Sequence, residues 1–519
     1  MPAPDTTLQA RSQRPRVNPW RRWGGFAADV MTGIVAALGQ APLDLWPLTV
    51  IAMAVLVWRL SILPIGATRI AFWRLLAAGT GYFAIGMLWI VDPFYVEPDL
   101  YAWMAPFALI LTALGGGLFW AIPGWIGWRI AAPTRTNRAV AVGAALVLSD
   151  WLRGWIFTGL PWALLGHVWI PTPAGQIAAW GGSILLSALT MAAAVVPTVE
   201  WRGTARSALR GVILSILLIA AAWFAGLARL AQPEPPATGI TLRLVQPDAK
   251  QALKWDPDWV WVFYERLLDL SHAPPKGPAP DAVIWPETSV PFLLDQAADA
   301  LPQIAASANG SPVLMGIQRS ENGVYFNSLI EVDRDGRVGL TYDKFHLVPF
   351  GEYVPWGDYL SRWNIGAFAA QQGFGYAKGT GPRMLSVPGL PDFQPLICYE
   401  AVFSRHLRAT GQRPAWILQI TNDAWFGNWS GPYQHLAQVR LRAIESGLPL
   451  MRSANTGVTA AIDARGRVLG SLPLNTQGAL DAALPGALPP TLWWRFGDWP
   501  AVMLSALALV ATVRRRRKT

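Results

Sequence analysis

The sequence predicts a fold in two parts, a membrane α-helical bundle of about eight spans and an α/β sandwich domain. Hydrophobic residues make up 53% of the chain and charged residues 14%, and the mean hydropathy of +0.30 is too apolar for a soluble protein of 519 residues. The apolar residues are unevenly distributed, because nearly continuous hydrophobic runs fill residues 1–230. Residues 241–484 instead have the mixed charge of a globular domain. The two parts are therefore expected to lie in different solvents.

The bundle is predicted from hydrophobic stretches that approach the length of about 20 residues needed to cross a bilayer. Pro42, Asp44 and Pro47 leave only a tight turn between the first two stretches. The expected spans are 24–40, 43–60, 71–91, 102–128, 137–155, 174–197, 209–230 and 496–513. An error of one span in this count would reverse the side of the membrane on which everything downstream lies.

Loop charge indicates the orientation of the bundle, because loops on the cytoplasmic side retain Lys and Arg. Arginines precede the first predicted span and flank alternate loops, whereas Asp92, Glu97 and Asp99 occupy a loop without a basic residue. This alternation predicts a multi-pass protein of the bacterial inner membrane with a periplasmic globular domain. The expected organisation is a cytoplasmic N-terminus at 1–23, a transmembrane domain of seven spans at 24–230, a periplasmic domain at 238–485, a final span at 496–513 and a basic cytoplasmic tail at 514–519.

The net charge of +10 and the pI near 9.9 are explained by this membrane topology. Basic residues cluster at the ends of apolar segments, and no basic stripe interleaved with aromatic residues occurs in the globular part, so nucleic acid is not an expected partner. Many of the 29 tryptophans lie near span ends, where indole rings settle at the level of the lipid head groups. A cleaved signal peptide is disfavoured because further spans follow the first apolar run at once. We also expect no second catalytic module after the last span.

The globular part is predicted to alternate strands and helices, as in an α/β domain with a sandwiched sheet. Short β-branched runs predict strands at 240–245, 282–285, 313–317, 328–332, 339–342, 396–397, 417–420 and 459–462. Helical stretches lie between several of them, such as 259–270 and 432–446. Active groups on such sheets sit at strand ends, so residues that follow these runs are the first candidates for a catalytic site.

Three residues at strand ends, Glu287, Lys344 and Cys398, supply the parts for acyl transfer through a thioester. Cys398 is the only cysteine, so it is either an inert buried side chain or a nucleophile. A thiol with an ordinary pKa of about 8.5 needs a base or a cation nearby. Glu287 is expected to take its proton, with a pKa raised by partial burial, and Lys344 to stabilise the oxyanion with a backbone N–H near Cys398. A plain ion pair between Glu287 and Lys344 is the alternative.

Five motifs around these residues narrow the interpretation. They are the segments 246–257, Trp285-Pro286-Glu287, 344–355, Cys398-Tyr399-Glu400 and 421–427. Together with the N-terminal membrane region and the final span, these motifs resemble the apolipoprotein N-acyltransferase family of the nitrilase, or carbon-nitrogen hydrolase, superfamily. The resemblance covers essentially the whole chain. It implies a nitrilase-like αββα sandwich domain that carries a Glu-Lys-Cys triad of Glu287, Lys344 and Cys398.

The resemblance also implies the reaction and its partners. An acyl chain would pass from a phospholipid, expected to be phosphatidylethanolamine, to the thiol of Cys398. It would then pass to the N-terminal diacylglyceryl-cysteine amine of an apolipoprotein. This ping-pong reaction is the last step of lipoprotein maturation and implies no cofactor.

Four further residues are implied to lie near the site: Trp255, Glu352, Tyr399 and Glu400. Glu352 is expected to brace the triad lysine or the triad glutamate, whereas the two aromatic residues are expected to shape an acyl pocket. Ordinary packing is the alternative for each of the four. The segment 355–378, rich in Gly, Trp and Phe, is a candidate lid, with an ordinary insertion as its alternative.

Two other functions fit parts of the sequence. A membrane-tethered carbon-nitrogen amidase of the nitrilase superfamily would share the triad, but a soluble substrate needs no multispan region. A transporter would explain the spans, yet it would leave the triad accidental, and the spans hold few charges that could line a path. A Cys-His dyad with His346 is disfavoured because Lys344 already has the family role, and the other histidines lack the spacing of metal ligands.

Overall fold

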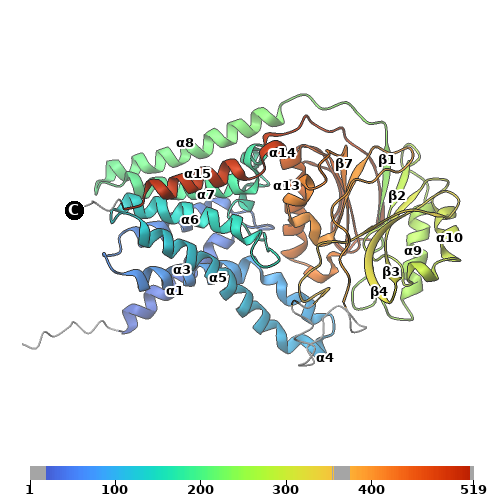
Figure 1. Cartoon of the computed structure of the whole chain (residues 1–519), viewed down its shortest axis with the longest axis horizontal. Helices are drawn as coiled ribbons and strands as arrows, with labels where there is room; N and C mark the ends of the chain where they lie inside the picture. The colour runs from blue at the N-terminus through green and yellow to red at the C-terminus, as the bar shows by residue number, and fades with distance from the viewer. Residues whose placement is uncertain (1–18, 354, 356–374, 515–519) are drawn as a thin grey trace, which may run out of the picture.

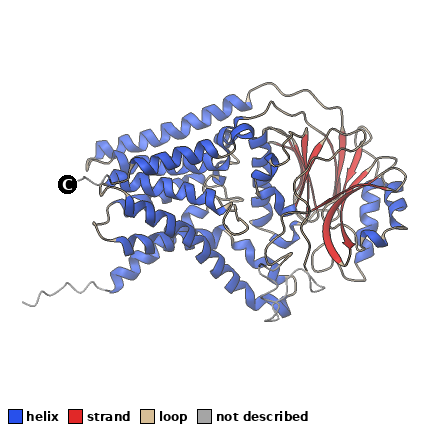
Figure 2. Ribbon diagram, in the orientation of Figure 1, coloured by secondary structure: helices blue, strands red, loops and turns tan. Residues whose placement is uncertain are grey.

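The computed structural model describes residues 19–353, 355 and 375–514, with side chains described from residue 25 onward. A bundle of helices forms one half of the elongated molecule, and a pair of stacked β-sheets forms the other (Figure 1 and Figure 2). Most of the candidate lid, 356–374, and most of the two expected cytoplasmic ends, 1–18 and 515–519, lie outside the described residues.

The bundle contains a helix in each region where the sequence predicts a span. Its long helices are α1 (Pro19–Ala37), α2 (Trp46–Ser61), α3 (Thr68–Gly86), α5 (Ala105–Ile130), α6 (Arg135–Arg153), α7 (Ala178–Glu200), α8 (Ala205–Leu230) and α15 (Trp499–Ala511). Shorter elements are η1 (Leu88–Tyr95), α4 (Pro98–Tyr101), η2 (Ala102–Met104), η3 (His167–Trp169), η4 (Pro173–Ile177) and α14 (Leu492–Phe496). α15 packs beside α6 and α7, so the chain returns to the bundle after it has formed the sheets (Figure 1).

Three helical segments within the described residues are long and apolar enough to cross a membrane: Pro98–Ile130, Pro173–Glu200 and Ala205–Leu230. The number becomes four if α3 and η1, which meet at a bend of 47°, form one broken span. The segments Gly25–Ala37, Trp46–Ser61 and Trp499–Ala511 are apolar but shorter. The described chain thus shows a helical region with three to four candidate spans, and the number eight stays a prediction.

Two β-sheets form the other half of the molecule. Their strands are β1 (Thr241–Gln246), β2 (Ala282–Ile284), β3 (Val313–Glu321), β4 (Val324–Val332), β5 (Val338–Asp343), β6 (Phe393–Ile397), β7 (Trp416–Thr421), β8 (Leu450–Ala454), β9 (Thr459–Ile462), β10 (Val468–Leu472) and β11 (Gly478–Ala483). One sheet has the order β11-β1-β2-β3-β4-β5, and the other has the order β10-β9-β8-β7-β6. The strands β1, β2 and β3 run parallel, as do β6, β7 and β8.

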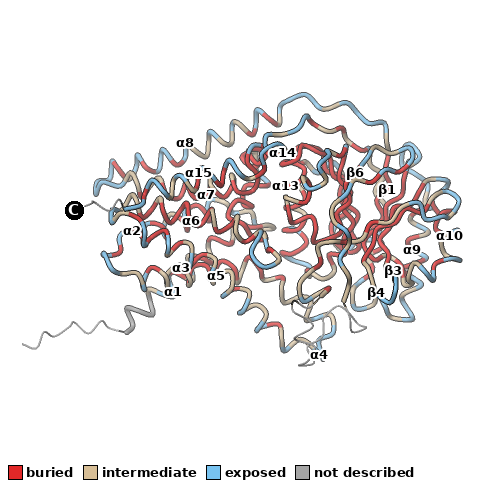
Figure 3. The backbone as a smooth tube through the Cα atoms, in the orientation of Figure 1, coloured by how far each residue is buried: buried red, intermediate tan, exposed pale blue. Residues whose placement is uncertain are grey.

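Helices cover the outer face of each sheet. α9 (Val260–His272) and α10 (Ala300–Ser307) pack on the first sheet, and α13 (Gly431–Ser446) packs on the second, between that sheet and the bundle (Figure 1). The remaining short elements are η5 (Leu294–Gln296), η7 (Cys398–Val402), α12 (Arg405–Arg408) and η8 (Asp423–Phe426). Buried chain runs through both sheets and into the bundle (Figure 3). The sandwich therefore has the αββα layering that the sequence predicts.

The predicted strands are confirmed, but the structure contains further strands that were not predicted. Each predicted strand is present, with bounds that shift by a few residues. The sequence patterns did not predict β8, β10 and β11, and the reasons differ for β8 and β11. Arg452 and Ser453 interrupt the apolar pattern of β8 although both are buried, because the fold supplies partners for them. β11, with the sequence Gly-Ala-Leu-Asp-Ala-Ala, lacks β-branched residues and is held by its antiparallel pairing with β1.

The bundle and the sandwich share buried hydrogen bonds. The indole Nε1 of Trp162 donates to Oε1 of Gln434 at 2.6 Å. The backbone N–H of Ser183, in α7, donates to Oε1 of Glu445, in α13, at 2.9 Å. Buried polar groups are costly when they lack partners, so each half completes the hydrogen bonding of the other.

Candidate active site

Cys398 is the first residue of η7 and directly follows β6, so it lies at the carboxyl end of a parallel strand. Its φ of 49° is in the left-handed region, which a residue other than glycine adopts only where its surroundings hold it. Gln419, on the neighbouring strand β7, donates from Nε2 to the carbonyl oxygen of Cys398 at 3.3 Å. The residue is 5% exposed. The strand-end position that the sequence predicts is thus a tight turn supported by a side chain of the next strand.

Lys344 follows β5 directly and is 1% exposed. Its Nζ donates to Oε1 of Glu287 at 3.2 Å and to Oε1 of Glu352 at 2.8 Å. Burial by itself lowers the pKa of Lys344, but the two carboxylates outweigh burial and raise this pKa well above its ordinary value. Lys344 is therefore a permanent cation that bridges two acidic residues.

Glu287 lies shortly after β2 and is buried. Its Oε1 accepts a hydrogen bond from Nδ2 of Asn327 at 2.7 Å, and its Oε2 accepts one from the backbone N–H of Asn422 at 2.8 Å. Burial raises the pKa of Glu287, but Lys344 and these donors hold the pKa below its ordinary value. The expectation of a raised pKa is therefore wrong for this arrangement, because it considered burial without the cation of Lys344 and without the donors from β4 and from the residue after β7.

The thiol of Cys398 lies within the electrostatic reach of both charged partners. Burial raises the pKa of Cys398 above its ordinary value; the carboxylate of Glu287 raises it further, and the ammonium of Lys344 opposes the rise. The resting site therefore combines a carboxylate, an ammonium and a neutral thiol. Such a thiol reacts when its proton leaves as the sulfur attacks, and Glu287 is the ionised base that can accept the proton.

Comparisons with known proteins place this site in a family. Residues 32–196 match the family model of the apolipoprotein N-acyltransferase N-terminal domain, and residues 241–488 match that of the carbon-nitrogen hydrolases. Proteins named apolipoprotein N-acyltransferase from Bradyrhizobium diazoefficiens, Sinorhizobium medicae and Brucella melitensis are 37%, 36% and 36% identical to this chain. The alignments cover 95%, 90% and 95% of this chain and 95%, 91% and 95% of those proteins. The chain belongs to the apolipoprotein N-acyltransferase family.

In this member of the apolipoprotein N-acyltransferase family, Glu352 lies beside Lys344. Its Oε1 also accepts a hydrogen bond from Nδ2 of Asn327 at 3.2 Å, and its Oε2 accepts one from the backbone N–H of Val348 at 2.8 Å. Asn327 therefore donates to Glu287 and to Glu352 from the same amide nitrogen. The structure places Glu352 where it can hold Lys344, as the sequence-based hypothesis requires.

Tyr399, next to Cys398, contacts the helical half of the molecule. Its hydroxyl donates to the carbonyl oxygen of Gly159, in the loop after α6, at 3.1 Å. Its ring packs edge-on against His346 and Phe403. Tyr399 thus connects the turn of Cys398 to the bundle, and its expected place in an acyl pocket stays a prediction.

His346 gives no support to a Cys-His dyad. Its ring stacks on Phe403, with 3.9 Å between the ring centroids. Burial and the nearby guanidinium of Arg405 lower the pKa of His346 to about 3. An imidazole with this pKa is a poor base for a thiol whose own pKa is raised.

Glu400 joins the segment of Lys344 to the turn of Cys398. Its Oε1 accepts a hydrogen bond from the backbone N–H of Phe345 at 2.7 Å. Its Oε2 accepts hydrogen bonds from the backbone N–H of Ile397 at 2.8 Å and from the hydroxyl of Tyr342 at 3.2 Å. Glu400 is fully buried, so its role in the described structure is to fix the distance between two strand ends.

We expect Glu400 to make the stability of the folded protein decrease as the pH rises towards neutral. Burial raises the pKa of Glu400 from 4.5 to about 7, so between these values the folded protein keeps a proton that the unfolded chain has lost. Protonated Glu400 contributes fully to the free energy of unfolding below its pKa in the unfolded chain. This contribution is lost as the pH rises to its pKa in the folded protein, a change of about 3 kcal/mol. Glu400→Gln should remove this part of the pH dependence, measured as the unfolding temperature in detergent at pH 5 and at pH 8.

Glu265→Gln is the matched control, because Glu265 is exposed on α9. The control should keep the pH dependence of the unmodified protein. Glu400→Gln also alters hydrogen bonds and can lower the unfolding temperature at both pH values. The quantity to compare between variants is therefore the difference between the unfolding temperatures at pH 5 and at pH 8. An undiminished difference would contradict the prediction.

Buried polar residues behind Cys398 were not predicted from the sequence. Arg452 donates to Oε1 of Gln419 and to Oδ2 of Asp423. Nδ1 of His435 lies 2.9 Å from Oδ1 of Asp423, and Nε2 of His435 lies 3.1 Å from Nε2 of Gln419. Although burial opposes it, Arg452 and His435 lower the pKa of Asp423 to about 2. This network orients the Gln419 amide that holds Cys398, and its sequence signal is a large polar side chain in the middle of each of two buried strands, Gln419 in β7 and Arg452 in β8.

Trp255 lies in the turn that follows β1 and is 37% exposed. Its ring lines a cavity together with the side chain of Lys254. Lys254 Nζ lies 3.5 Å from the backbone carbonyl oxygen of Glu287. The structure therefore places Trp255 on the Glu287 side of the candidate site of this apolipoprotein N-acyltransferase family member.

Proposed function

We propose that the protein transfers an acyl chain from a phospholipid to the N-terminal diacylglyceryl-cysteine amine of apolipoproteins, the last step of lipoprotein maturation. The family assignment spans both halves of the chain and supports this reaction. The observation that carries the proposal is the group in which Lys344 bridges Glu287 and Glu352 close to the turn of Cys398. Such a group supplies a base, a cation for an oxyanion and a nucleophile.

In the first half-reaction, Glu287 accepts the thiol proton as the sulfur of Cys398 attacks an ester carbonyl of the phospholipid. A C–S bond forms, and the carbonyl oxygen becomes an oxyanion that the ammonium of Lys344 stabilises. One preorganised donor of this kind lowers a barrier by about 3 to 4 kcal/mol. Glu287 then gives the proton to the glycerol oxygen as the C–O bond breaks. The products are a thioester and a lysophospholipid, with phosphatidylethanolamine as the expected donor.

In the second half-reaction, the amine of the apolipoprotein attacks the thioester carbonyl. A C–N bond forms, and the C–S bond breaks. Glu287 accepts a proton from the attacking amine and gives it to the departing sulfur, which restores the thiol of Cys398. The two substrates therefore use one site in turn, which is a ping-pong scheme.

The proposal places the protein in the inner membrane of a bacterium, with the catalytic domain, 238–485, in the periplasm. The apolar helices of the described chain support a membrane location. Loop charge supports a cytoplasmic start at 1–23, spans within 24–230 and 496–513, and a cytoplasmic tail at 514–519. Both proposed substrates are anchored by lipid, so their exchange takes place at a bilayer surface.

Intact-protein mass spectrometry tests the proposal. We expect the purified protein to gain an acyl mass when it is incubated with phosphatidylethanolamine in detergent, and to lose that mass in neutral hydroxylamine. Cys398 is the only thiol in the chain, so Cys398→Ala should show no adduct. A diacylglyceryl lipopeptide should then remove the acyl group from the parent protein. Absence of the adduct, together with hydrolysis of a simple amide, would favour the amidase.

A further inference from the structure

The end of β7 contacts the candidate active site on both sides of Thr421. Two residues before it, Gln419 donates from Nε2 to the carbonyl oxygen of Cys398 at 3.3 Å. One residue after it, the backbone N–H of Asn422 donates to Oε2 of Glu287 at 2.8 Å. Side chains alternate along a strand, so Thr421 presents its hydroxyl on the same face of β7 as Gln419 presents its amide. Thr421 is fully buried, so its hydroxyl has to find its partners within the protein.

The pairing of β6 with β7 brings this hydroxyl to the thiol. The two strands run parallel with Ile397 beside Ile420, and the residues that follow this pair are Cys398 and Thr421. Burial raises the pKa of the Cys398 thiol, and a hydrogen bond with the hydroxyl of Thr421 opposes this rise. Thr421 thus acts on the sulfur from the neighbouring strand, while Gln419 holds the carbonyl oxygen of the same residue.

The hydroxyl of Thr421 is anchored on a buried carboxylate. Its Oγ1 donates to Oδ1 of Asp423 at 2.9 Å, and the same Oδ1 lies 2.9 Å from Nδ1 of His435. Arg452 donates to the other oxygen, Oδ2. A hydroxyl has one hydrogen and two lone pairs, so Thr421 can accept the S–H of the neutral thiol while it donates to Asp423. When the sulfur is negatively charged, this hydrogen can turn to the sulfur, because His435 and Arg452 still pair with Asp423.

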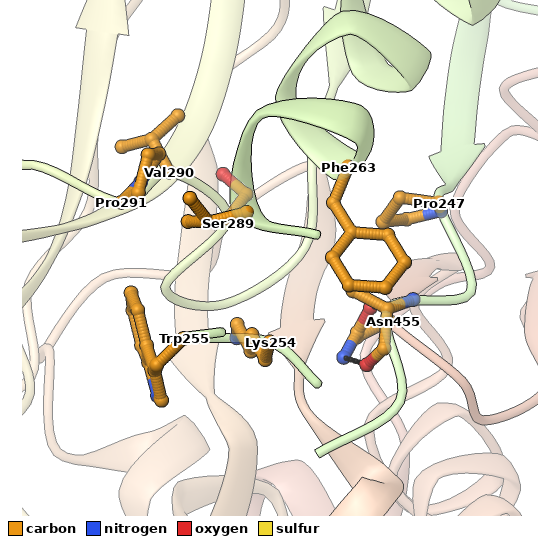
Figure 4. A pocket seen from close by; sticks show the side chains of 10 residues that line it. Pro247, Lys254, Trp255, Phe263, Ser289, Val290, Pro291 and Asn455 are labelled. Carbon is orange, nitrogen blue, oxygen red and sulfur yellow. Dashed lines mark hydrogen bonds between the residues drawn. The ribbon is translucent and has the colours of Figure 1, made fainter. Parts of the chain in front are cut away.

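The backbone of Thr421 is fixed as well. Its carbonyl oxygen accepts a hydrogen bond from the backbone N–H of Asn455 at 3.0 Å. Asn455 directly follows β8 (Figure 4). Its Nδ2 donates to Oδ1 of Asn422 at 2.9 Å and to the carbonyl oxygen of Ala249 at 2.7 Å. The place of the hydroxyl is therefore set by the neighbouring strand as well as by its own contacts.

We propose that Thr421 is a positioning residue for the nucleophile: its hydroxyl, anchored on Asp423, orients the sulfur of Cys398 and donates to it when it carries negative charge. This inference rests on the proposed function, in which charge develops on the sulfur as the thiol proton leaves and again as the amine displaces the sulfur from the thioester. The charged groups that act on the sulfur are Glu287, Lys344 and Asp423. A neutral hydroxyl among them stabilises the negative sulfur without competing with Glu287 for the proton.

Two substitutions test the hydroxyl. Thr421→Val keeps the size of the side chain and removes the hydroxyl, whereas Thr421→Ser keeps the hydroxyl. In Thr421→Val, the pH at which iodoacetamide alkylates the only thiol should shift upward by about one unit, because the hydrogen bond that favours the charged sulfur is lost. Acylation by phosphatidylethanolamine at a fixed pH should fall about tenfold for the same reason. Thr421→Ser should behave like the parent in both measurements.

Thr459→Val is the matched control, because Thr459 is a fully buried threonine on β9 of the same sheet. It should keep the alkylation profile of the parent, although it loses hydrogen bonds with the backbone of Ala454. A variant with a loosened fold would alkylate faster at every pH, which is opposite to the shift expected of Thr421→Val.

An alkylation profile of Thr421→Val that matches the parent would overturn the proposal. Equal losses in Thr421→Val and Thr421→Ser would also overturn it, because packing and not the hydroxyl would then hold the sulfur. Alkylation requires no acyl donor, so it tests Thr421 whatever the substrate is. A parent protein that is alkylated but gains no acyl mass from any phospholipid would instead contradict the proposed function, so the two failures are distinguishable.

Discussion

Lys344→Met is expected to inactivate the protein and to destabilise it at the same time. The ammonium lies 3.2 Å from Glu287 and 2.8 Å from Glu352, so its loss leaves two buried carboxylates without a cation. Breaking a buried ion pair from one side costs about 3 to 5 kcal/mol. Loss of an oxyanion donor slows acylation by a further ~10²- to 10³-fold. Intact-protein mass spectrometry measures the acylation rate, and thermal unfolding in detergent measures the stability.

A double variant separates these two effects of Lys344. In Lys344→Met with Glu352→Gln, one buried carboxylate is neutralised together with the cation. We expect the unfolding temperature of the double variant to recover most of the decrease seen in the single variant. The acylation rate should stay at the level of the single variant. Recovery of both quantities would show that Lys344 only balances charge and takes no part in the chemistry.

Glu287→Gln should slow the acylation of Cys398 while making the thiol more acidic. A general base accelerates a reaction by about 10²- to 10⁴-fold, and the amide of the variant cannot accept the thiol proton. The carboxylate of Glu287 raises the pKa of Cys398 and the ammonium of Lys344 opposes that rise, so removal of the negative charge should lower the pKa of the thiol. Acylation by phospholipid should fall, and the pH at which iodoacetamide alkylates the only thiol should shift downward.

The opposite directions of these two readouts distinguish a catalytic base from a structural ion pair. A variant that merely unfolded would alkylate faster at every pH and would lose its cooperative thermal transition. Glu265→Gln, on the exposed face of α9, should change neither readout. Acylation of Glu287→Gln at the rate of the parent would show that another group accepts the proton.

The strand-end positions of the three candidate catalytic residues could be predicted from local sequence, but their electrostatics could not. Glu287, Lys344 and Cys398 each follow a short apolar run, and strands with such patterns bring their polar end residues together. Burial raises the pKa of Glu287, and its net lowering depends first on Lys344 and then on two donors, Asn327, inside β4, and the backbone of Asn422, after β7. Neither donor is marked by local spacing, because each is positioned by the stacking of two sheets.

In the helical half too, local sequence predicted where the long helices lie, whereas other properties depend on contacts that only the folded structure provides. Apolar runs located each of the long helices, but they did not settle which helices are long enough to cross a membrane. α6 illustrates the reason, since Arg138, Asp150 and Arg153 are all buried in it. Asp150 accepts hydrogen bonds from Arg153, from the backbone N–H of Leu165 and from Ser187, partners that only the folded bundle provides.

The buried hydrogen bonds between the two halves mean that residues 238–485 are not a detachable enzyme. Cut free, the sandwich would leave the Tyr399 hydroxyl, next to Cys398, and the Glu445 carboxylate without the partners that Gly159 and Ser183 now provide. α13 would also present to water the apolar face that packs on α7. The bundle therefore does more than hold the sandwich at the membrane: it supplies buried hydrogen-bond partners to it, and a soluble fragment would need a new surface in their place.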